Sequence, residues 1–401
     1  MKTQGEINKK EILSRGVQMV YPSLGFVESK MNKGEKMTIY LGIDPTGPTL
    51  HLGHVIPLKI LSRFQKAGHK VIMLLGDFTA MIGDPTDKSS ARVALTHKQV
   101  LVNLKNYKKQ ASRILDFSGK NKAEVKFNSK WLGKMKFEDV LKLASTTTVQ
   151  QMLERDMFEK RIEEGKPIFI HEFLYPLMQG YDSVAMDVDG EIGGNDQTFN
   201  MLAGRDLMKT LKNKEKFVIT VKLLEDNTGK KMGKTEGNMI AISDSPNEMF
   251  GKVMSWNDSL IIPGFELCTD VHMETVASIE ADIARGALNP RDAKMRLARE
   301  IITTFYGEKE ANAEQENFIS TFSKKEIPDD VPEYDAGPDS NLIDIFTENK
   351  VVSSKGDFRR LVEEGAITNL STDTKINNTN TKAQEGVYRI GKKRFCKISF
   401  K

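Results

Sequence analysis

The sequence predicts an α/β chain in which a Rossmann-like, doubly wound parallel-sheet domain precedes an α-helical domain and a small, basic α+β domain. Strand-like and helix-like runs alternate over residues 36–225, which is typical of a doubly wound sheet. Strand patterns are missing from residues 246–325. Residues 341–401 then carry 12 Lys and Arg against 7 Asp and Glu, with aromatic residues at strand spacing near the end.

The first domain begins with a strand that ends in a turn. Apolar residues over 37–43 indicate the strand, and Pro45, Gly47 and Pro48 prevent it from continuing. Helix-period apolar residues predict a helix over 50–66. Similar patterns predict a buried strand over 71–75, a helix over 96–115 and a strand over 217–224. Ligands of such sheets bind at the carboxyl ends of the strands, where these turns lie.

The remaining segments are helical, then extended, then compact. Periodicity predicts helices over 273–287 and 290–305, the second opened by Asn289-Pro290 as cap and first-turn proline. Residues 326–340 hold three prolines and six acidic residues, which predicts an extended linker. We therefore expect a catalytic domain over 1–225, a mobile loop over 226–245, a helical domain over 246–325, this linker, and a C-terminal domain over 341–401.

Composition limits the class of protein. The chain of 401 residues is 39% hydrophobic and 28% charged, which is typical of a soluble globular protein with two or three domains. The first ten residues lack an apolar signal core, and the apolar run over 71–75 is too short to span a membrane. Two cysteines do not form a disulfide framework, so we expect a cytoplasmic protein.

Charge is unevenly distributed along the chain. The overall balance is +4, of which residues 341–401 supply +5 (12 minus 7) and residues 1–340 supply −1 (47 minus 48). A basic module on a near-neutral body indicates a polyanionic partner, whereas the alternative is a solvated tail. Aromatic and aliphatic residues between the basic ones favour a folded module.

Two short blocks carry the chemistry. His51 and His54 lie one turn apart at the predicted start of a helix that follows a strand, where backbone N–H groups and the helix dipole favour anions. Alone, this pair is weak evidence and is equally consistent with packing or chance. No third ligand lies at metal spacing nearby, so we expect no protein-bound metal. The block Lys231-Met232-Gly233-Lys234-Thr235 follows a polar, glycine-containing stretch and is predicted to be a mobile loop. Together the two blocks indicate a protein that binds ATP and transfers one of its phosphate groups.

Three further regions accompany these blocks. A second phosphate-like loop extends over 76–88, directly after a buried strand. Tyr175, Gln179 and Asp182 fall on one helix face, either as a solvated stripe or as the lining of a polar pocket. The turn over 191–197 brings backbone and an acid together.

On these residues the chain resembles the bacterial-type tyrosyl-tRNA synthetases, a family of class I aminoacyl-tRNA synthetases. His51-Leu52-Gly53-His54 matches the first class signature, and the block over 231–235 matches the second, with Gly and Thr where many relatives carry serines. Tyr40, the Tyr175 face and the turn over 193–197 resemble the tyrosine enzymes specifically. The resemblance covers essentially the whole chain. Glu191 departs from it, because many relatives have glutamine there.

The resemblance implies a role for each site residue. It implies ATP as substrate with Mg²⁺, no organic cofactor, and tyrosine as the activated amino acid. The catalytic and phosphate-contacting residues would be Thr46, His51, His54, Lys88, Arg92, Lys231, Lys234 and Thr235. Tyrosine would contact Tyr40, Asp84, Tyr175, Gln179, Asp182 and Gln197. Further ATP contacts would come from Gly42, Asp44, Gly194 and Asp196, together with His51, His54 and Lys234.

The resemblance also implies partners. Residues 353–367 are similar to an RNA-binding module of a small-subunit ribosomal protein, which implies tRNA(Tyr) as partner. The expected RNA contacts are Lys355, Arg359, Arg360, Lys392, Lys393 and Arg394. A homodimer is implied as well, with the apolar segment 167–170 as our candidate for its core.

Three other functions remain as alternatives. A tryptophanyl-tRNA synthetase is the nearest, although Tyr40 with Asp182 and the C-terminal module argue against it. A small-molecule nucleotidyltransferase would share the histidine block but would not need the helical domain and basic module. An RNA-binding or splicing protein derived from a synthetase is disfavoured by the intact His51, His54, Lys231 and Lys234.

Overall fold

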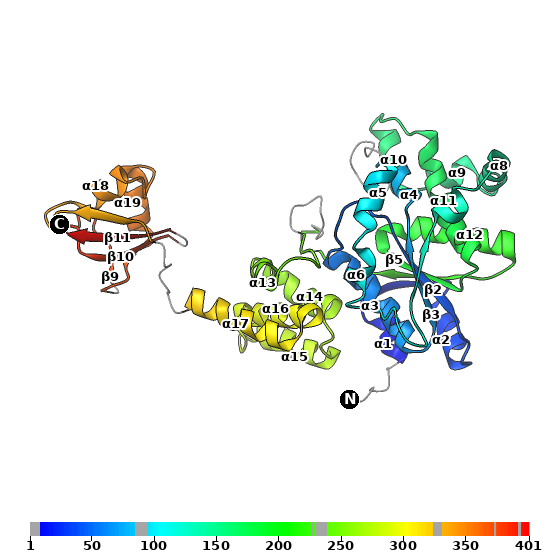
Figure 1. The fold of residues 1–401 in the computed structure, drawn as a ribbon, viewed down its shortest axis with the longest axis horizontal. Helices are drawn as coiled ribbons and strands as arrows, with labels where there is room; N and C mark the ends of the chain where they lie inside the picture. The colour runs from blue at the N-terminus through cyan, green and yellow to red at the C-terminus, as the bar shows by residue number, and fades with distance from the viewer. Residues whose placement is uncertain are drawn as a thin grey trace. The chain divides into compact units, whose positions relative to one another are not determined.

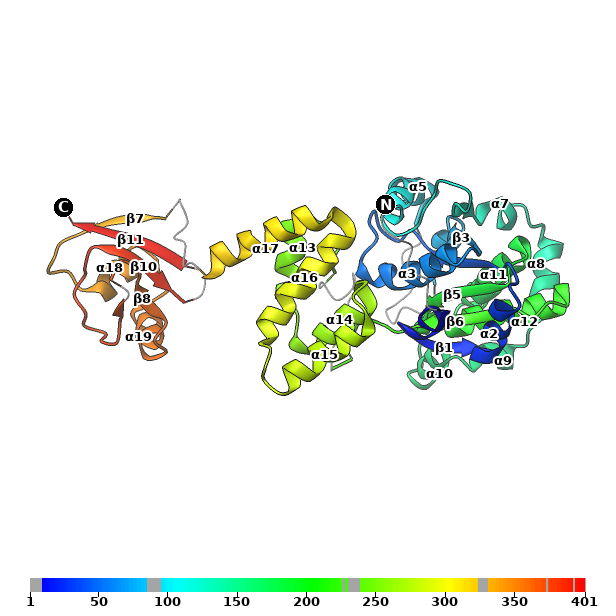
Figure 2. The same cartoon turned by 90° about the horizontal axis from the view of Figure 1, so that it is seen from below.

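The computed structural model describes residues 9–84, 95–225, 228–229, 239–323, 331–372, 374–391 and 394–400. The chain forms two compact units, Met1–Gln315 and Glu316–Lys401 (Figures 1 and 2). Within the described ranges, no helix is long and apolar enough to cross a membrane.

A mainly parallel sheet forms the core of the first unit. In the part of the chain that the structure describes, its strand order is β1-β6-β5-β2-β3-β4, with β1 antiparallel to β6 and the other neighbours parallel. The strands are β1 (Val17–Tyr21), β2 (Thr38–Ile43), β3 (Lys70–Leu75), β4 (Glu124–Phe127), β5 (Gly190–Gly194) and β6 (Phe217–Val221). Strands β3 and β6 are almost wholly apolar and buried, as expected when helices cover both faces.

Helices cover this sheet on both faces. Helix α3 (Leu52–Lys66) packs against β2 and β3, whereas α12 (Thr198–Lys212) packs against β5 and β6 and against α11 (Ile170–Met186). The crossover from β2 to β3 runs in the opposite direction to that from β5 to β6, so right-handed crossovers put α3 and α12 on opposite faces. The other helices here are α1 (Lys9–Ser14), α2 (Leu24–Asn32), α4 (Thr79–Ile82), α5 (His97–Leu104), α6 (Tyr107–Ala111), α7 (Ser129–Leu132), α8 (Phe137–Ala144), α9 (Val149–Leu153), α10 (Asp156–Glu163) and the 3₁₀ turn η1 (Asn195–Gln197).

Helices alone follow the sheet over the described residues 246–323. They are α13 (Pro246–Met254), η2 (Asp258–Leu260), α14 (Ile261–Cys268), α15 (Met273–Ala284), α16 (Pro290–Tyr306) and α17 (Glu308–Ser323). Asn289 caps α16 by accepting from the N–H of Arg291, with Pro290 in the first turn as predicted. The expected α-helical segment after the doubly wound sheet is therefore present.

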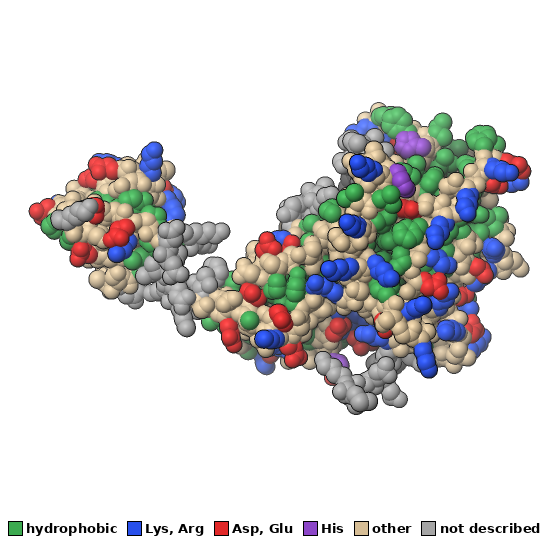
Figure 3. Space-filling view, in the orientation of Figure 1, with side chains coloured by type: hydrophobic (Ala, Val, Ile, Leu, Met, Phe, Trp, Pro, Cys, Tyr) green, Lys and Arg blue, Asp and Glu red, His purple; other side chains and the backbone are tan. Residues whose placement is uncertain are grey.

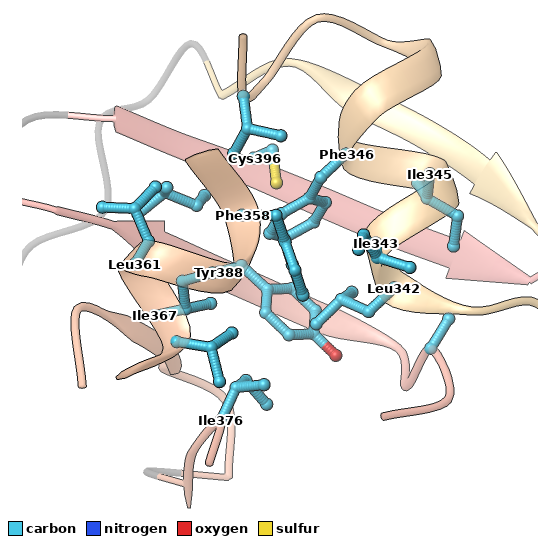
Figure 4. Close-up of a cluster of buried hydrophobic side chains, with 14 of the residues drawn as sticks. Leu342, Ile343, Ile345, Phe346, Phe358, Leu361, Ile367, Ile376, Tyr388 and Cys396 are labelled. Carbon is cyan, nitrogen blue, oxygen red and sulfur yellow. The ribbon is translucent and has the colours of Figure 1, made fainter. Parts of the chain in front are cut away.

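The second unit is a small α+β fold. Helices α18 (Leu342–Glu348) and α19 (Lys355–Glu363) pack on a sheet whose order, among described residues, is β7-β11-β10-β8-β9. Its strands are β7 (Glu333–Ala336), β8 (Ile367–Asn369), β9 (Thr374–Lys375), β10 (Gly386–Ile390) and β11 (Arg394–Phe400). Phe346 meets the rings of Phe358 and Tyr388 edge-on, with centroids 5.8 and 5.6 Å apart, at the centre of its core (Figure 4).

Two expectations need correction. The helix predicted over 96–115 is broken into α5 and α6, because Tyr107 turns inward and donates its OH to the carbonyl of Gly47 at 2.7 Å. Residues 333–336, predicted as linker, form β7 and pair in parallel with β11. Lys397 explains this pairing, since its N–H donates to Pro332 O at 2.9 Å and its ammonium lies 3.0 Å from Glu333. Proline and acidic residues are compatible with an edge strand.

Candidate active site at the carboxyl ends of β2 and β5

The predicted site residues gather where the strand order reverses. Strands β2 and β5 are neighbours, but the chain continues from them in opposite directions across the sheet. Asp44, Thr46 and His51 follow the end of β2, and Asp196 and Gln197 follow the end of β5. A switch point of this kind is the ordinary ligand site of an open α/β sheet.

His51 and His54 open α3 and cap it reciprocally. The N–H of Gly53 donates to His51 Nδ1 at 3.1 Å, and the N–H of His51 donates to His54 Nδ1 at 3.2 Å. Burial lowers the pKa of His51 to about 4, and burial together with His51 lowers the pKa of His54 well below its usual value. Both rings are therefore neutral at pH 7. Because Nδ1 accepts in each, the proton lies on Nε2, which is available as a donor.

The loop between β2 and α3 is braced by the two helices α5 and α6. Asn103 Nδ2 donates to the carbonyl of Pro45 at 2.8 Å, and Gln110 Oε1 accepts from the N–H of Leu50 at 2.6 Å. Together with the Tyr107 bond to Gly47, these contacts fix the backbone that carries Thr46. Sequence reasoning missed all three bracing side chains, which are ordinary polar residues in an unremarkable helical run.

The second signature, residues 231–235, lies wholly outside the described residues, but the segment that follows it from residue 239 is described. Lys231, Lys234 and Thr235 belong to the undescribed range 230–238, and Lys88 and Arg92 to the undescribed range 85–94. Ile240, five residues after Thr235, accepts from the N–H of Leu52 at 3.0 Å, and Ala241 bridges His51. Ile240 and Ala241 therefore lie beside the start of α3, which carries the first signature.

Asp44 connects three segments of the site. Thr79 Oγ1 and Tyr175 OH donate to its two carboxylate oxygens, each at 2.7 Å. A Cβ on Gly76 would lie 1.9 Å from Asp44 Oδ1, so only glycine fits after β3. Burial and the charge of Asp44 raise the pKa of Tyr175 well above its usual value. Tyr175 is thus a fixed, neutral donor whose oxygen lone pairs remain available as acceptors.

Asp84 and Gln197, both expected to contact the amino acid, lie in direct contact with each other. Gln197 Nε2 donates to Asp84 Oδ2 at 2.7 Å, and Asn200 Nδ2 donates to Gln197 Oε1 at 2.9 Å. The amide of Gln197 is therefore held at both ends. Asp196 and Gly194 lie next to this pair on η1 and at the end of β5, with Asp196 exposed.

Tyr40 and Asp182 lie in the buried wall of the same region. Tyr40 is fully buried and its OH lies 2.9 Å from Ser183 Oγ. Asp182 is 2% exposed and accepts from Trp131 Nε1 at 2.7 Å and Asn128 Nδ2 at 3.2 Å. Burial raises the pKa of the Asp182 carboxyl well above its usual range, while these two donors oppose the rise. Sequence reasoning found no partner for Asp182, because Asn128 and Trp131 come from a segment about fifty positions earlier.

Gln179 contacts Glu191, the residue that departs from the family pattern. Gln179 Nε2 donates to Glu191 Oε1 at 3.3 Å, and the other carboxylate oxygen forms an ion pair with the buried Lys216. Sequence reasoning did not single out Lys216. A lysine immediately before the almost wholly apolar β6 is the available signal.

The expected RNA contacts on the second unit are exposed but partly paired. Lys355 lies 2.7 Å from Asp344, and Arg360 lies 2.8 Å from Asp357 and 2.9 Å from Glu364. Arg359 is exposed, and Arg394 is exposed but donates to the carbonyl of Val351 at 2.8 Å. Lys392 and Lys393 lie outside the described residues. Acidic and basic side chains are interspersed on the visible face of this unit (Figure 3).

Comparison with known proteins identifies the family. The model of the tRNA synthetases class I (W and Y) matches residues 31–323. The chain therefore belongs to the class I tRNA synthetases of the tryptophan and tyrosine branch. Within it, the chain is 45% identical to a tyrosine–tRNA ligase of Carboxydothermus hydrogenoformans, over 97% of both chains. It is 44% identical to the tyrosine–tRNA ligase of Thermotoga maritima, over 97% of this chain and 96% of that one.

Solved structures confirm the predicted fold class. A C-terminally truncated mitochondrial tyrosyl-tRNA synthetase of Aspergillus nidulans matches with a TM-score of 0.67 at 23% identity, covering 78% of this chain and 93% of that one. The tyrosyl-tRNA synthetase of Archaeoglobus fulgidus complexed with L-tyrosine matches with a TM-score of 0.60 at 20% identity, covering 76% and 98%.

Proposed function

We propose that this chain is a tyrosine–tRNA ligase that works in two steps at the switch point of its sheet. Tyrosine carboxylate attacks the α-phosphate of ATP, giving tyrosyl-adenylate and pyrophosphate, and the terminal ribose hydroxyl of tRNA(Tyr) then takes the tyrosyl group. The observation that carries the proposal is the joint placement of the His51/His54 signature and the buried Tyr40 and Asp182 around one strand end. The sequence identity of 44–45% with two tyrosine–tRNA ligases, over 97% of this chain, supports the proposal.

The first step needs no side-chain base, because the attacking carboxylate is already ionised. Catalysis then comes from positioning and from donors to the charge that develops on the departing pyrophosphate. Neutral His51 and His54 supply Nε2–H donors, and Thr46 lies on the braced loop beside them. We assign the other phosphate contacts to Lys88, Arg92, Lys231, Lys234 and Thr235. Mg²⁺ enters with ATP as part of the substrate.

The amino acid is held at three points. The substrate ammonium needs acceptors and at least one anion, which Asp84, Tyr175 and Gln179 provide. Its phenol faces Tyr40 and Asp182, and Gln197 lies toward the carboxylate and α-phosphate. Gly42, Asp44, Gly194 and Asp196 form the adenosine side with His54. The fixed amide of Gln197 supports its part in this assignment, since it is held by Asp84 and Asn200.

Replacement of Lys234 by alanine is expected to slow tyrosyl-adenylate formation by about 10²–10³-fold, with tyrosine affinity nearly unchanged, because one preorganised donor to the phosphate charge is lost. Single-turnover kinetics and equilibrium binding of tyrosine measure the two effects separately. Lys222→Ala, which removes a surface lysine paired with Glu266 at 2.8 Å, is the control. Loss of tyrosine affinity at an unchanged single-turnover rate would contradict the assigned role.

The tRNA is assigned mainly to the helical segment and the C-terminal unit, in keeping with the predicted domain boundaries. The cytoplasm, where tRNA charging takes place, is the proposed location. Charging of tRNA(Tyr) with tyrosine and of tRNA(Trp) with tryptophan, assayed side by side, separates this function from its nearest alternative. Charging of tRNA(Tyr) with tyrosine, and not of tRNA(Trp) with tryptophan, would support the proposal. Charging of tRNA(Trp) with tryptophan would show instead that the chain is a tryptophanyl-tRNA synthetase.

A symmetric homodimer is proposed through the segment 167–170. Phe169 and Ile170 are 47% and 81% exposed, while Glu172 fixes their backbone by accepting from the N–H of Phe169 at 2.9 Å. Exposed apolar side chains on an ordered segment are typical of an interface. Sedimentation is expected to give a dimer for the parent and a monomer for Phe169→Asp/Ile170→Asp. Met273→Asp, at an exposed methionine of α15, is expected to remain dimeric. A monomeric parent at micromolar concentration, fully active in charging, would refute the dimer.

A further inference from the structure

A buried ion pair lies behind the proposed tyrosine site. Lys216, directly before β6, and Glu191, on β5, have side chains that are 0% and 2% exposed, and they contact each other directly. A buried charge is costly unless it is paired and hydrogen-bonded. This pair satisfies that condition through two further contacts, and each of them leads to a residue of the proposed tyrosine site.

One contact leads to Tyr40 and the other to Gln179. Lys216 Nζ donates to Ser183 Oγ at 2.9 Å, and Ser183 Oγ lies 2.9 Å from the Tyr40 hydroxyl. On the other side, Glu191 Oε1 accepts from Gln179 Nε2 at 3.3 Å. The pair therefore reaches Tyr40 through Ser183 and through Lys216 Nζ, which lies 5.8 Å from the centroid of the Tyr40 ring, and it contacts Gln179 directly.

The chemistry of the pair gives these contacts a direction. An ammonium group only donates, so Ser183 Oγ accepts from Lys216, and this leaves the Ser183 proton available for donation to the Tyr40 oxygen. Burial, together with the charges of Glu191 and Asp182, raises the pKa of Tyr40 well above its usual value, so Tyr40 keeps its own proton and can donate it toward a substrate phenol. A carboxylate only accepts, so Glu191 holds the Gln179 amide with its nitrogen inward and leaves the carbonyl oxygen for a substrate ammonium.

The helices around the ammonium leave room for lysine. A Cβ on Gly204 of α12 would lie 2.8 Å from Lys216 Nζ, and a Cβ on Gly180 of α11 would lie 3.0 Å from the backbone N of Gly204. The two glycines thus allow α11 and α12 to approach closely around Lys216. The ammonium occupies a fitted position between Ser183 and Glu191.

We propose that Lys216 and Glu191 are positioning residues that set the hydrogen-bond direction of Tyr40, through Ser183, and of Gln179. This inference rests on the proposed function, because it concerns how the same site recognises tyrosine. It makes Lys216 and Ser183 determinants of selectivity for the phenol, and Glu191 a determinant of affinity for the amino group.

The contact from Lys216 through Ser183 to Tyr40 and the contact from Glu191 to Gln179 are expected to affect the kinetics differently. Ser183→Ala and Lys216→Met interrupt the path to Tyr40, and each is expected to raise KM for tyrosine and lower the tyrosine-to-phenylalanine ratio of kcat/KM by about tenfold. Glu191→Gln loosens Gln179 and also leaves Lys216 without its charge partner, so it is expected to raise KM for phenylalanine as well as for tyrosine, whereas Ser183→Ala should leave KM for phenylalanine near the parent value. In every variant KM for ATP should stay near the parent value. Amino-acid-dependent pyrophosphate exchange measures all of these quantities.

Controls separate this network from general stability. Lys59→Met removes another buried lysine, which pairs with Asp270 at 2.8 Å on the opposite face of the sheet, and should leave selectivity at the parent value. If Lys216→Met does not fold, Ser183→Ala and the double variant Lys216→Met/Glu191→Gln, which leaves no unpaired buried charge, decide the matter. The inference is overturned if the folded Ser183→Ala variant and the double variant both keep the tyrosine-to-phenylalanine ratio of kcat/KM of the unmodified chain. Absence of tyrosine-dependent exchange in the unmodified chain would instead contradict the proposed function.

Discussion

Replacement of Asp182 by alanine is expected to reduce the preference for tyrosine over phenylalanine by about 10³-fold or more, and to weaken tyrosine binding as well. Tyrosine enzymes of this class are known to reject phenylalanine by about 10⁵-fold without editing, because the analogue leaves buried polar groups unpaired. Asp182 is 2% exposed, and we assign it, together with the buried Tyr40, to the substrate phenol. Its removal takes away the acceptor for the substrate phenol, so phenylalanine no longer carries a penalty there. Pyrophosphate exchange with each amino acid gives the ratio of kcat/KM.

A buried aspartate near the same edge of the sheet provides the matched control. Asp77 is 5% exposed and accepts from the N–H and Oγ of Ser129 at 2.9 and 2.6 Å, much as Asp182 accepts from Trp131 and Asn128. Asp77→Ala is expected to lower stability while keeping the parent selectivity. Undiminished rejection of phenylalanine by Asp182→Ala would mean that Asp182 is structural and that the phenol lies elsewhere.

Truncation after Ser323 is expected to leave tyrosine activation close to that of the full chain and to lower tRNA affinity by about 10³-fold, because grouped phosphate contacts are lost together. The shortened chain keeps the whole region matched by the family model and every residue assigned to tyrosine or ATP. It loses the acidic stretch 324–340, with a net charge of −4 (2 minus 6), and the basic segment 341–401, with a net charge of +5 (12 minus 7). Charging of tRNA should collapse, and the fall of tRNA affinity with rising salt should become less steep.

A full-length variant separates charge from the loss of a folded unit. Arg359→Ala/Arg394→Ala removes two exposed arginines, so both its tRNA affinity and its salt slope should lie between those of the full and truncated chains. Normal charging by the truncated chain would reduce the C-terminal unit to a solvated appendage. Failure at activation would show that the predicted domain boundary is wrong.

The sequence predicts the elements whose pattern is local. The strand, turn and helix around Pro45 correspond to β2 and α3, and the periodic runs after residue 270 correspond to α15 and α16. The break between α5 and α6 was not predictable, because it depends on Tyr107 reaching the carbonyl of Gly47, sixty residues earlier. Strand β7 was missed for a similar reason, since an acidic, proline-flanked segment becomes a strand only when β11 is beside it.

The residues of the candidate site also fall into two groups, those that the sequence predicts and those that it does not. Residues within a signature, such as His51 with His54 or Tyr175 with Gln179, were found because their spacing is itself the signal. Their partners come from distant segments: Ser183 for Tyr40, Trp131 for Asp182 and Lys216 for Glu191. A single sequence contains no information on which distant polar residues pair. In the sequence Glu191 stands out only as a departure from the family pattern, and its pairing with Lys216 in the structure supplies the physical explanation.

The most direct test of the account is pyrophosphate exchange into ATP by the unmodified chain with each of the twenty amino acids in turn. The reaction depends on the first step alone and needs no tRNA. The proposed site predicts rapid exchange with tyrosine, and exchange with phenylalanine and tryptophan lower by several orders of magnitude. Exchange with tryptophan in preference to tyrosine, or no exchange with any amino acid, would contradict the assignment of Tyr40 and Asp182 to a tyrosine phenol.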